Sequence, residues 1–499
     1  MLEHLRTEIE SFTTEISREY YLQGAGLKES IDIKSFYEKY PSVKDRNNIE
    51  LIKAESERST EDPEKTKQLR YLLENTYREI TSFEQSPITE KVLEAEFTGK
   101  IKYGEKEYFY RSIINEIINT SDRTIRETLN DIKNKFIENN LNPLLSESFK
   151  LGHLITKEFG FENLTEMFIN ISSINLHDLN KEAGEFLKYS EDIYYDLLKY
   201  YSKKILESDI PELKKHDLMY MMKYNKFDRY FPGNEMFTTI DKFVSGMGID
   251  IGSKGRIKPD IEKRNQKSPR AFCSPVRIPE EIYLVINPRG GEDDYTTFLH
   301  ELGHSLHFSH INPDLCFEYK YCGDNSVTEG FAMLFDHLIA NRIWLQKIMK
   351  MDNKGINDFL LFKTFRELSM LRRYSAKLDY ELKFYEDETT ENRKAEYKDI
   401  LSKAVKAEYT ESEYLTDIDD YFYVARYLRA WMFQHSLSEY LIENFGEDWF
   451  INSASGSFLR HIWSYGQKYD ANELLKLNNC SELSLKALFN HLNNQAKYV

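Results

Sequence analysis

The stretch TTFLHELGHSLHFSHIN, from Thr296 to Asn312, contains four of the twelve histidines of this 499-residue chain. Its core is the pattern His-Glu-x-x-His, which runs from His300 to His304. On a helix, residues four positions apart project from one face, so two imidazole nitrogens at this spacing can bind one Zn²⁺ ion. The glutamate between them then borders the open position of the metal, where it can take a proton from water. The stretch therefore predicts half of a zinc site on a helix.

A catalytic zinc site needs a third protein ligand, and two residues compete for this role. His310 lies ten residues after His300, where the metzincin pattern has its third histidine. That pattern requires a glycine at the position of His307 so that the helix can stop, and we therefore disfavour His310. Glu329 lies in GDNSVTEGFAMLFDHL, where Asp324 and its neighbours can cap a second helix with an apolar face. We predict Glu329 as the third ligand.

The bulk composition argues against several classes of function. The formal net charge is −16, with lysine and arginine spread among the acids, so nucleic acid and anionic membranes are unexpected partners. The four cysteines form no CxxC pair and are too few for a disulfide framework. The N-terminal stretch MLEHLRTEIESFTTEISREYY lacks the apolar segment of a secretory signal, and no apolar run approaches the roughly 18 residues of a membrane span. We therefore expect a soluble, cytoplasmic protein.

Proline indicates how the chain is organised. Six of the twelve prolines fall between Pro259 and Pro313, and none follows, which indicates an irregular middle between two helical parts. In this middle, EEIYLVINP (residues 280–288) is typical of a strand, and RAFCSP upstream is its candidate partner. The strand could present an edge to an extended peptide, or could be a plain core strand. We expect a mainly α-helical protein, with residues 1–200 as a helical lobe and 201–499 as the region that holds the zinc site.

The sequence around these residues resembles the M3 family of zinc oligopeptidases, the thimet oligopeptidase and oligoendopeptidase F group. The resemblance lies in HELGHSLH, in a glutamate 25 residues after His304, and in KSPRAFCSPVRIPEEIYLVIN, which is similar to the family's strand-forming stretch before the zinc helix. It implies a large helical, two-lobed metallopeptidase with a small β element beside the zinc helix and a deep substrate channel. One Zn²⁺ per chain would be bound by His300, His304 and Glu329, with Glu301 as general base. A histidine at position 307 also belongs to the family pattern, and we expect His307 to support a ligand or line the site.

The family stabilises the oxyanion of the tetrahedral intermediate from a C-terminal helix with a motif similar to Tyr-Tyr-x-Tyr-Leu-Trp. DDYFYVARYLRAWMF resembles this motif, with Tyr427 at the last tyrosine and Tyr423 one turn earlier. Val424 replaces a tyrosine of the motif, and the family's upstream histidine is missing. The resemblance implies Tyr427 as the hydrogen-bond donor and Tyr423 as the second candidate, with aromatic packing as the alternative for both.

The resemblance implies a zinc-dependent endopeptidase that hydrolyses internal bonds of short, unstructured peptides. Two alternatives stay open. A helical zinc carboxypeptidase would use the same zinc ligands, with Arg426 or Arg429 holding the C-terminal carboxylate of the substrate. A binding protein with a structural zinc site is the non-enzyme alternative, although Glu301 would then have no purpose and a closed site would need a fourth protein ligand.

Overall fold

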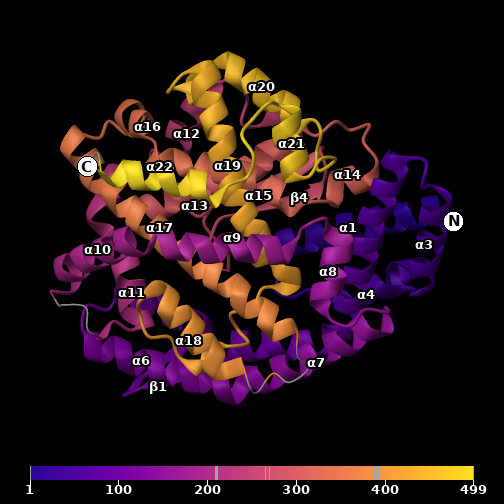
Figure 1. The fold of residues 1–499 in the computed structure, drawn as a ribbon, viewed down its shortest axis with the longest axis horizontal. Coiled ribbons are helices and arrows are strands. Elements are labelled where there is room, and N and C mark those ends of the chain that lie inside the picture. The colour runs from indigo at the N-terminus through magenta and orange to yellow at the C-terminus, as the bar shows by residue number, and fades with distance from the viewer. Residues whose placement is uncertain are drawn as a thin grey trace.

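The computed structural model describes residues 2–207, 212–264, 266–268, 270–386, 390 and 393–497. Most of the described chain is helical, which confirms the predicted mainly α-helical fold (Figure 1). The N-terminal helices are α1 (Leu2–Gly24), α2 (Ile33–Lys39), α3 (Asn47–Arg58), α4 (Pro63–Thr98), α5 (Tyr110–Asn119), α6 (Arg123–Phe136), α7 (Asn142–Glu158), α8 (Leu164–Ser172), α9 (Leu176–Tyr189) and α10 (Glu191–Tyr201). The later helices are α11 (Lys215–Met222), α12 (Met236–Gly246), α13 (Glu292–His310), α14 (Phe317–Tyr321), α15 (Asn325–Asp336), α16 (Arg342–Lys347), α17 (Asn353–Glu386), α18 (Arg393–Val405), α19 (Tyr423–Phe445), α20 (Ser453–Trp463), α21 (Ala471–Leu477) and α22 (Leu485–Lys497).

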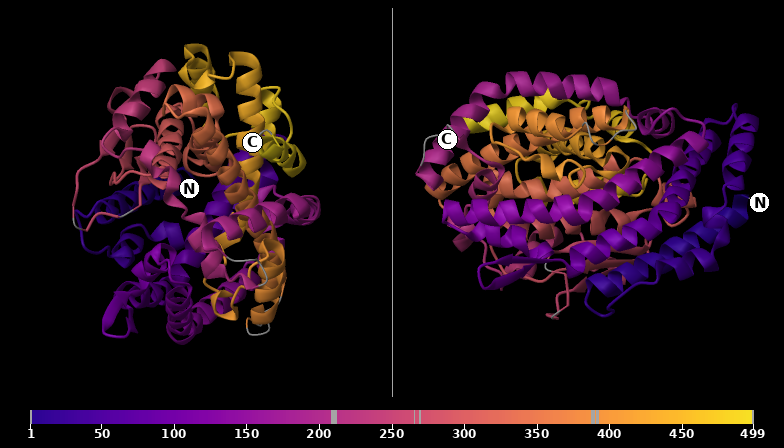
Figure 2. Two further views of the ribbon diagram at one scale, coloured as in Figure 1. Left: turned by 90° about the vertical axis from the view of Figure 1, so that its left-hand side faces the viewer. Right: turned by 90° about the horizontal axis from the view of Figure 1, so that it is seen from below.

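The helices pack around one large hydrophobic core and several smaller ones. The large core extends from α8 to α22, whereas smaller clusters lie among α1, α4 and α7. In the left-hand view of Figure 2, the violet helices α4 to α7 occupy the lower half, and most of the orange and yellow C-terminal helices occupy the upper half. The division into residues 1–200 and 201–499 stays a prediction. None of the described helices combines the length and apolar character needed to cross a membrane.

A three-stranded sheet lies beside α13 and has the order β3-β5-β4. Strand β4 (Phe272–Arg277) pairs antiparallel with β5 (Glu281–Val285), which confirms the predicted partnership of the two stretches. Strand β3 (Ile257–Asp260) pairs parallel with the other side of β5. The central place of β5 contradicts its reading as an edge for a peptide, and the edge nearer to α13 is β4. We did not predict β3, because its charged residues and its proline are atypical of a strand, although an edge strand tolerates both.

A second, two-stranded sheet joins α4 to α5. It is the antiparallel hairpin of β1 (Lys100–Tyr103) and β2 (Lys106–Phe109), which turns through a glycine with φ of 60° at position 104. This hairpin lies among the N-terminal helices, far along the chain from the predicted zinc site.

Helix α13 confirms the helix predicted over the His-Glu-x-x-His pattern. It begins at Glu292, three residues before Tyr295. The chain enters it through Gly290 and Gly291, whose φ angles of 96° and 94° are left-handed and favour glycine. Asp294 in the first turn reaches back, and its Oδ2 accepts the backbone N–H groups of Arg289 at 2.6 Å and of Gly290 at 2.8 Å. The acidic first turn also suits the positive end of the helix dipole, so the start of α13 is fixed by local interactions.

Candidate metal centre

Helices α13 and α15 approach each other closely at Gly303, between the two predicted histidine ligands. A methyl group at this position would come within 2.6 Å of Cα of Ala332 and 2.7 Å of the carbonyl oxygen of Phe331. Only glycine therefore allows the two helices this separation. The Asp324 side chain accepts the N–H of Ser326 at 2.9 Å, which confirms the predicted cap of α15 and fixes where that helix begins.

The three predicted ligands come together across this contact. One ligand atom each of His300, His304 and Glu329 lies within 4.8 Å of the other two. Oε2 of Glu329 is 3.4 Å from Nε2 of His300 and 3.6 Å from Nε2 of His304. This buried oxygen has no hydrogen-bond partner among the described residues. Two imidazole nitrogens and an unpartnered carboxylate oxygen that point at one another fit a divalent cation such as Zn²⁺.

The other ring nitrogen of each histidine has a hydrogen-bond partner on α15. Nδ1 of His300 lies 2.8 Å from Oδ2 of Asp336, and Nδ1 of His304 lies 3.0 Å from Oγ1 of Thr328. When Nδ1–H donates to an oxygen, Nε2 carries the lone pair that a metal needs. The sequence interpretation missed both partners. The only signal was spacing: Asp336 is two helical turns after Glu329 and therefore on the same face of α15.

Asp336 is itself part of a buried network of charged side chains. Its Oδ1 lies 2.5 Å from Nδ1 of His337, whose Nε2 lies 3.0 Å from Oε1 of Glu367 on α17. Burial would lower the pKa of His337, but the two carboxylates outweigh it and raise that pKa to about 10. The resulting imidazolium lowers the pKa of Asp336 and keeps this carboxylate ionised. A negative charge therefore lies next to Nδ1 of His300.

Glu301 points from α13 toward the edge strand. Its Oε2 accepts the backbone N–H of Cys273 on β4 at 2.8 Å, and both residues line one pocket with His304 and Glu329. The Ser305 hydroxyl contacts Sγ of Cys273 at 3.3 Å, and burial raises the pKa of this thiol far above its usual range. Strand β4 thus holds one oxygen of Glu301.

The two predicted tyrosines occupy different positions. The Tyr423 hydroxyl donates to Oε1 of Glu329 at 2.7 Å and lines the pocket. The Tyr427 ring packs between Tyr423 and Tyr374 of α17, with centroids 4.9 and 5.5 Å away. Burial, reinforced by the charges of Glu329 and Glu301, raises the pKa of Tyr427, so its hydroxyl stays protonated.

The chain enters α19 through two consecutive strained residues. Tyr421 and Phe422 have φ angles of 49° and 51°, in the left-handed region that non-glycine residues rarely adopt. Tyr423 is the first residue of α19, so this turn fixes the direction of its side chain. Backbone strain of this kind persists only where the surrounding structure enforces it, and it often marks functional sites.

The remaining histidines of the opening stretch lie outside the group of three. His307 is fully buried; its ring packs on Phe331, 4.8 Å between centroids, and its Nε2 is 3.4 Å from the carbonyl oxygen of Gly466. It supports the contact between α13 and α15 rather than a ligand, because its direction on the helix takes it into the core. His310 lies in the last turn of the unbroken helix α13, and its Nδ1 is 2.8 Å from the carbonyl oxygen of Leu306, which agrees with the rejection of the metzincin pattern.

Arg426 and Arg429, the candidates for binding a substrate carboxylate, are buried and already paired. Arg426 bonds Glu74 of α4, and Nη2 of Arg429 lies 3.0 Å from Oδ2 of Asp324. These pairs tie α19 to α4 and to the start of α15. Neither arginine is therefore free to bind the substrate carboxylate that the carboxypeptidase alternative assigned to it.

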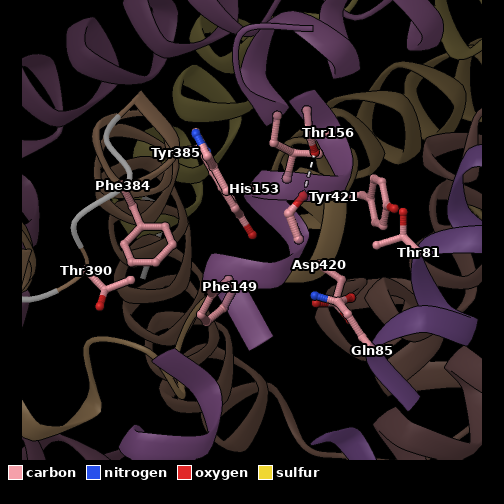
Figure 3. A pocket seen from close by; sticks show the side chains of 12 residues that line it. Thr81, Gln85, Phe149, His153, Thr156, Phe384, Tyr385, Thr390, Asp420 and Tyr421 are labelled. Carbon is pink, nitrogen blue, oxygen red and sulfur yellow. Dashed lines mark hydrogen bonds between the residues drawn. The ribbon is translucent and has the colours of Figure 1, made fainter. Parts of the chain in front are cut away.

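The pocket over the metal group has a volume of about 370 Å³. Residues of α1, β4, α13, α14, α15 and α19 line it, so the N-terminal helix contributes directly to its wall. A separate, smaller pocket of about 60 Å³ lies between α4, α7, the end of α17 and the turn before α19 (Figure 3). It holds aromatic side chains and Asp420, and none of the predicted site residues lines it.

No protein-family model matches the chain, and no curated protein matches its sequence. The resemblance to zinc oligopeptidases thus stays a prediction, carried by the motif residues and by the possible metal site that His300, His304 and Glu329 form.

Proposed function

We propose that this chain is a zinc-dependent endopeptidase that hydrolyses internal bonds of short, unstructured peptides. One observation carries the proposal: His300, His304 and Glu329 converge around an unpartnered, buried carboxylate oxygen, and Glu301 lines the same pocket. A merely structural zinc site would leave Glu301 with only its hydrogen bond to the Cys273 backbone and would need a fourth protein ligand. Among the described residues, the group that could hold a metal contains three.

The proposed cofactor is one Zn²⁺ per chain, which supplies a Lewis acid for the scissile carbonyl and for water. Glu301 takes the proton from the attacking water and delivers it to the leaving amine. Its Oε2 is held by the Cys273 amide, so Oε1 is the oxygen that performs this transfer. The water oxygen first bonds to the carbonyl carbon and gives a tetrahedral oxyanion. When this intermediate collapses, the C–N bond breaks, the leaving nitrogen takes the proton held by Glu301, and the products are a carboxylate and an amine.

The tyrosines divide two tasks in this proposal. Tyr423 orients Glu329 through the hydrogen bond to Oε1. Tyr427, whose ring packs on Tyr423 and whose hydroxyl stays protonated, donates a hydrogen bond to the oxyanion of the tetrahedral intermediate. The partners are short peptides, because a pocket of about 370 Å³ lined by five helices and one strand has room for a few residues of an unfolded chain and not for a folded domain.

The proposal also includes a cytoplasmic location, in keeping with four free cysteines.

The test of the activity is direct. Enzyme loaded with one equivalent of zinc should cleave an internally quenched peptide of about ten residues, and a chelator should stop the cleavage. Mass spectrometry of the products should show cuts at internal bonds. Failure of the zinc-loaded, folded enzyme to cleave a mixture of such peptides would refute the proposal.

A further inference from the structure

One cationic side chain, Lys320, is present among the described residues that line the metal pocket. It lies near the end of the short helix α14, and its side chain is 14% exposed. Its Nζ is 3.1 Å from Oε1 of Glu10 on α1. An ammonium group has three donors, so this contact leaves two for another acceptor in the pocket.

A buried amide lies on the same wall. Gln467 is only 3% exposed, lines the pocket, and its Oε1 has no hydrogen-bond partner among the described residues. The backbone N–H of Gln467 donates to the carbonyl oxygen of Tyr319 at 2.8 Å, which holds it next to Lys320. A buried amide oxygen left without a partner is costly unless a ligand or a rotated amide supplies the hydrogen bond. Rotation of the amide by half a turn presents its NH₂ group as a donor instead.

A third donor completes the wall. Tyr321 lines the pocket, and its hydroxyl oxygen accepts the backbone N–H of Ile278 at 2.9 Å. Burial raises the pKa of Tyr321 to about 12, so the hydroxyl keeps its proton and can donate it. The ammonium of Lys320, the amide of Gln467 and this hydroxyl are therefore three donors of one pocket.

We propose that Lys320, Gln467 and Tyr321 bind the free C-terminal carboxylate of the peptide substrate. A carboxylate is the group that matches an ammonium with neighbouring neutral donors, since charge-assisted hydrogen bonds are the strongest of this kind. The inference rests on the proposed peptidase function and narrows its substrates. Because Glu301, His304 and Glu329 line the same pocket, a peptide anchored in this way has an internal bond near its C-terminus at the metal group.

The charges in the pocket favour one position for the C-terminal carboxylate of the substrate. The chain carries a formal charge of −16, and Glu301 and Glu329 lie in the pocket itself. A bound Zn²⁺ would offset these two acids, so the charge that distinguishes one wall of the pocket is that of Lys320, which attracts a substrate carboxylate. Both arginines of α19 are engaged elsewhere, so Lys320 is the cationic side chain among the described lining residues that a carboxylate can meet.

The test compares one peptide in two forms, with a free C-terminal carboxylate and with a C-terminal amide. The wild-type enzyme should show a kcat/KM roughly 10- to 100-fold higher for the free acid, the range expected for a charged hydrogen bond. The released C-terminal fragment should have a fixed length in a series of peptides extended at their N-termini. Equal kcat/KM values for acid and amide would overturn the inference while leaving the peptidase function intact.

Two matched variants separate the carboxylate site from a structural ion pair. Lys320→Met should bring the ratio of the kcat/KM values for the free-acid and the amidated peptide close to one. Lys320→Arg should retain part of the wild-type preference for the free acid. Glu10→Gln removes the same ion pair but keeps the lysine, so the ratio should stay high. Equal changes of the ratio in Lys320→Met and Glu10→Gln would overturn the inference.

A binding measurement covers the remaining cases. Calorimetry with the zinc-loaded Glu301→Gln variant should give tighter binding of the acid than of the amide. If wild-type enzyme cleaves neither peptide, the peptidase proposal fails, and this difference in binding still decides whether a carboxylate site exists. If Lys320→Met does not fold, as circular dichroism would show, the acid-to-amide comparison in wild type and Lys320→Arg decides.

Discussion

The Tyr423 hydroxyl donates a 2.7 Å hydrogen bond to Oε1 of Glu329, which lies 94 positions earlier in the chain. The other oxygen of the same carboxylate, Oε2, faces His300 and His304. The helix that resembles the oxyanion-stabilising helix of zinc oligopeptidases is therefore attached directly to the proposed third ligand. The two tyrosines of this helix can then be tested for different roles.

Tyr423→Phe should weaken zinc binding. The substitution removes the hydrogen bond that orients Glu329, and loss of such a partner typically costs 10- to 100-fold in metal affinity. Competition with a chromophoric chelator measures the zinc dissociation constant. At saturating zinc, kcat should fall less than the affinity does. An unchanged dissociation constant would show that Glu329 does not need this tyrosine.

Tyr427→Phe should have the opposite pattern. Its hydroxyl is proposed to stabilise the oxyanion, so kcat should fall by roughly 10²- to 10³-fold, the loss typical of an oxyanion donor. The zinc affinity should match wild type, because the ring packs beside Tyr423 without bonding a ligand. If kcat survives in this variant and collapses in Tyr423→Phe, the two assignments must be exchanged.

Glu301→Gln should retain zinc and lose peptide cleavage. Glu301 is not one of the three grouped ligands, and removal of a general base costs roughly 10²- to 10⁴-fold in rate. Elemental analysis after gel filtration measures bound zinc, and a quenched peptide measures the rate. Glu329→Gln is the matched control, because the same change at a ligand should release zinc. Wild-type cleavage by Glu301→Gln would exclude it as the base.

The three ligands could be predicted because helix geometry links sequence spacing to direction. His300 and His304 are one turn apart, and Glu329 follows a recognisable cap on a second apolar helix. Their supporting partners could not be predicted in the same way. Asp336 and Thr328 meet the histidines only because α15 packs on α13 at one rotation, and this rotation depends on side chains along the whole contact.

The three-stranded sheet shows the same limit of prediction from sequence. The pairing of β4 with β5 could be predicted because the two stretches are close in sequence and joined by a turn. The position of β5 in the sheet depends on β3, whose pairing brings together segments separated by a long connection. Likewise, a sequence window places Arg426 on the same helix as the tyrosines, but its partner Glu74 lies 352 positions away.

Gly303→Ala should separate the two ligand-bearing helices. The added methyl group would lie 2.6 Å from Cα of Ala332, a backbone atom that cannot move without shifting α15. Overpacking of this kind costs about 1–3 kcal/mol, and the shift should also lower zinc affinity. Urea unfolding of the metal-free protein and chelator competition measure the two effects.

The control for this variant is Gly184→Ala in α9. Among the described residues, apart from its chain neighbours and the nearby backbone of α9 itself, no atom lies within 4 Å of a methyl group added there. Alanine in a helix interior is favoured over glycine by about 0.5–1 kcal/mol, so this variant should be slightly stabilised and bind zinc normally. Equal zinc affinity in the two variants would show that the close approach at Gly303 does not position Glu329.

The last prediction concerns the pH dependence of stability through His307. Burial, with no carboxylate beside the ring, lowers the pKa of His307 to about 3, whereas an unfolded chain keeps a value near 6.5. Between pH 6.5 and 3, His307 therefore binds a proton in the unfolded state and stays neutral in the folded state. The contribution of His307 to the free energy of unfolding is complete above pH 6.5 and falls as the pH drops toward 3, by up to about 1.4 kcal/mol per pH unit.

His307→Phe should remove this dependence, because phenylalanine fills the same space against Phe331 without a titrating group. Urea unfolding of the metal-free proteins between pH 5 and 7.5 gives the slope of stability against pH. Other groups titrate equally in both proteins, so the difference between the two slopes isolates His307, and it should approach one proton near pH 5. Parallel slopes would mean that His307 is protonated in the folded state and that its ring is hydrated or paired.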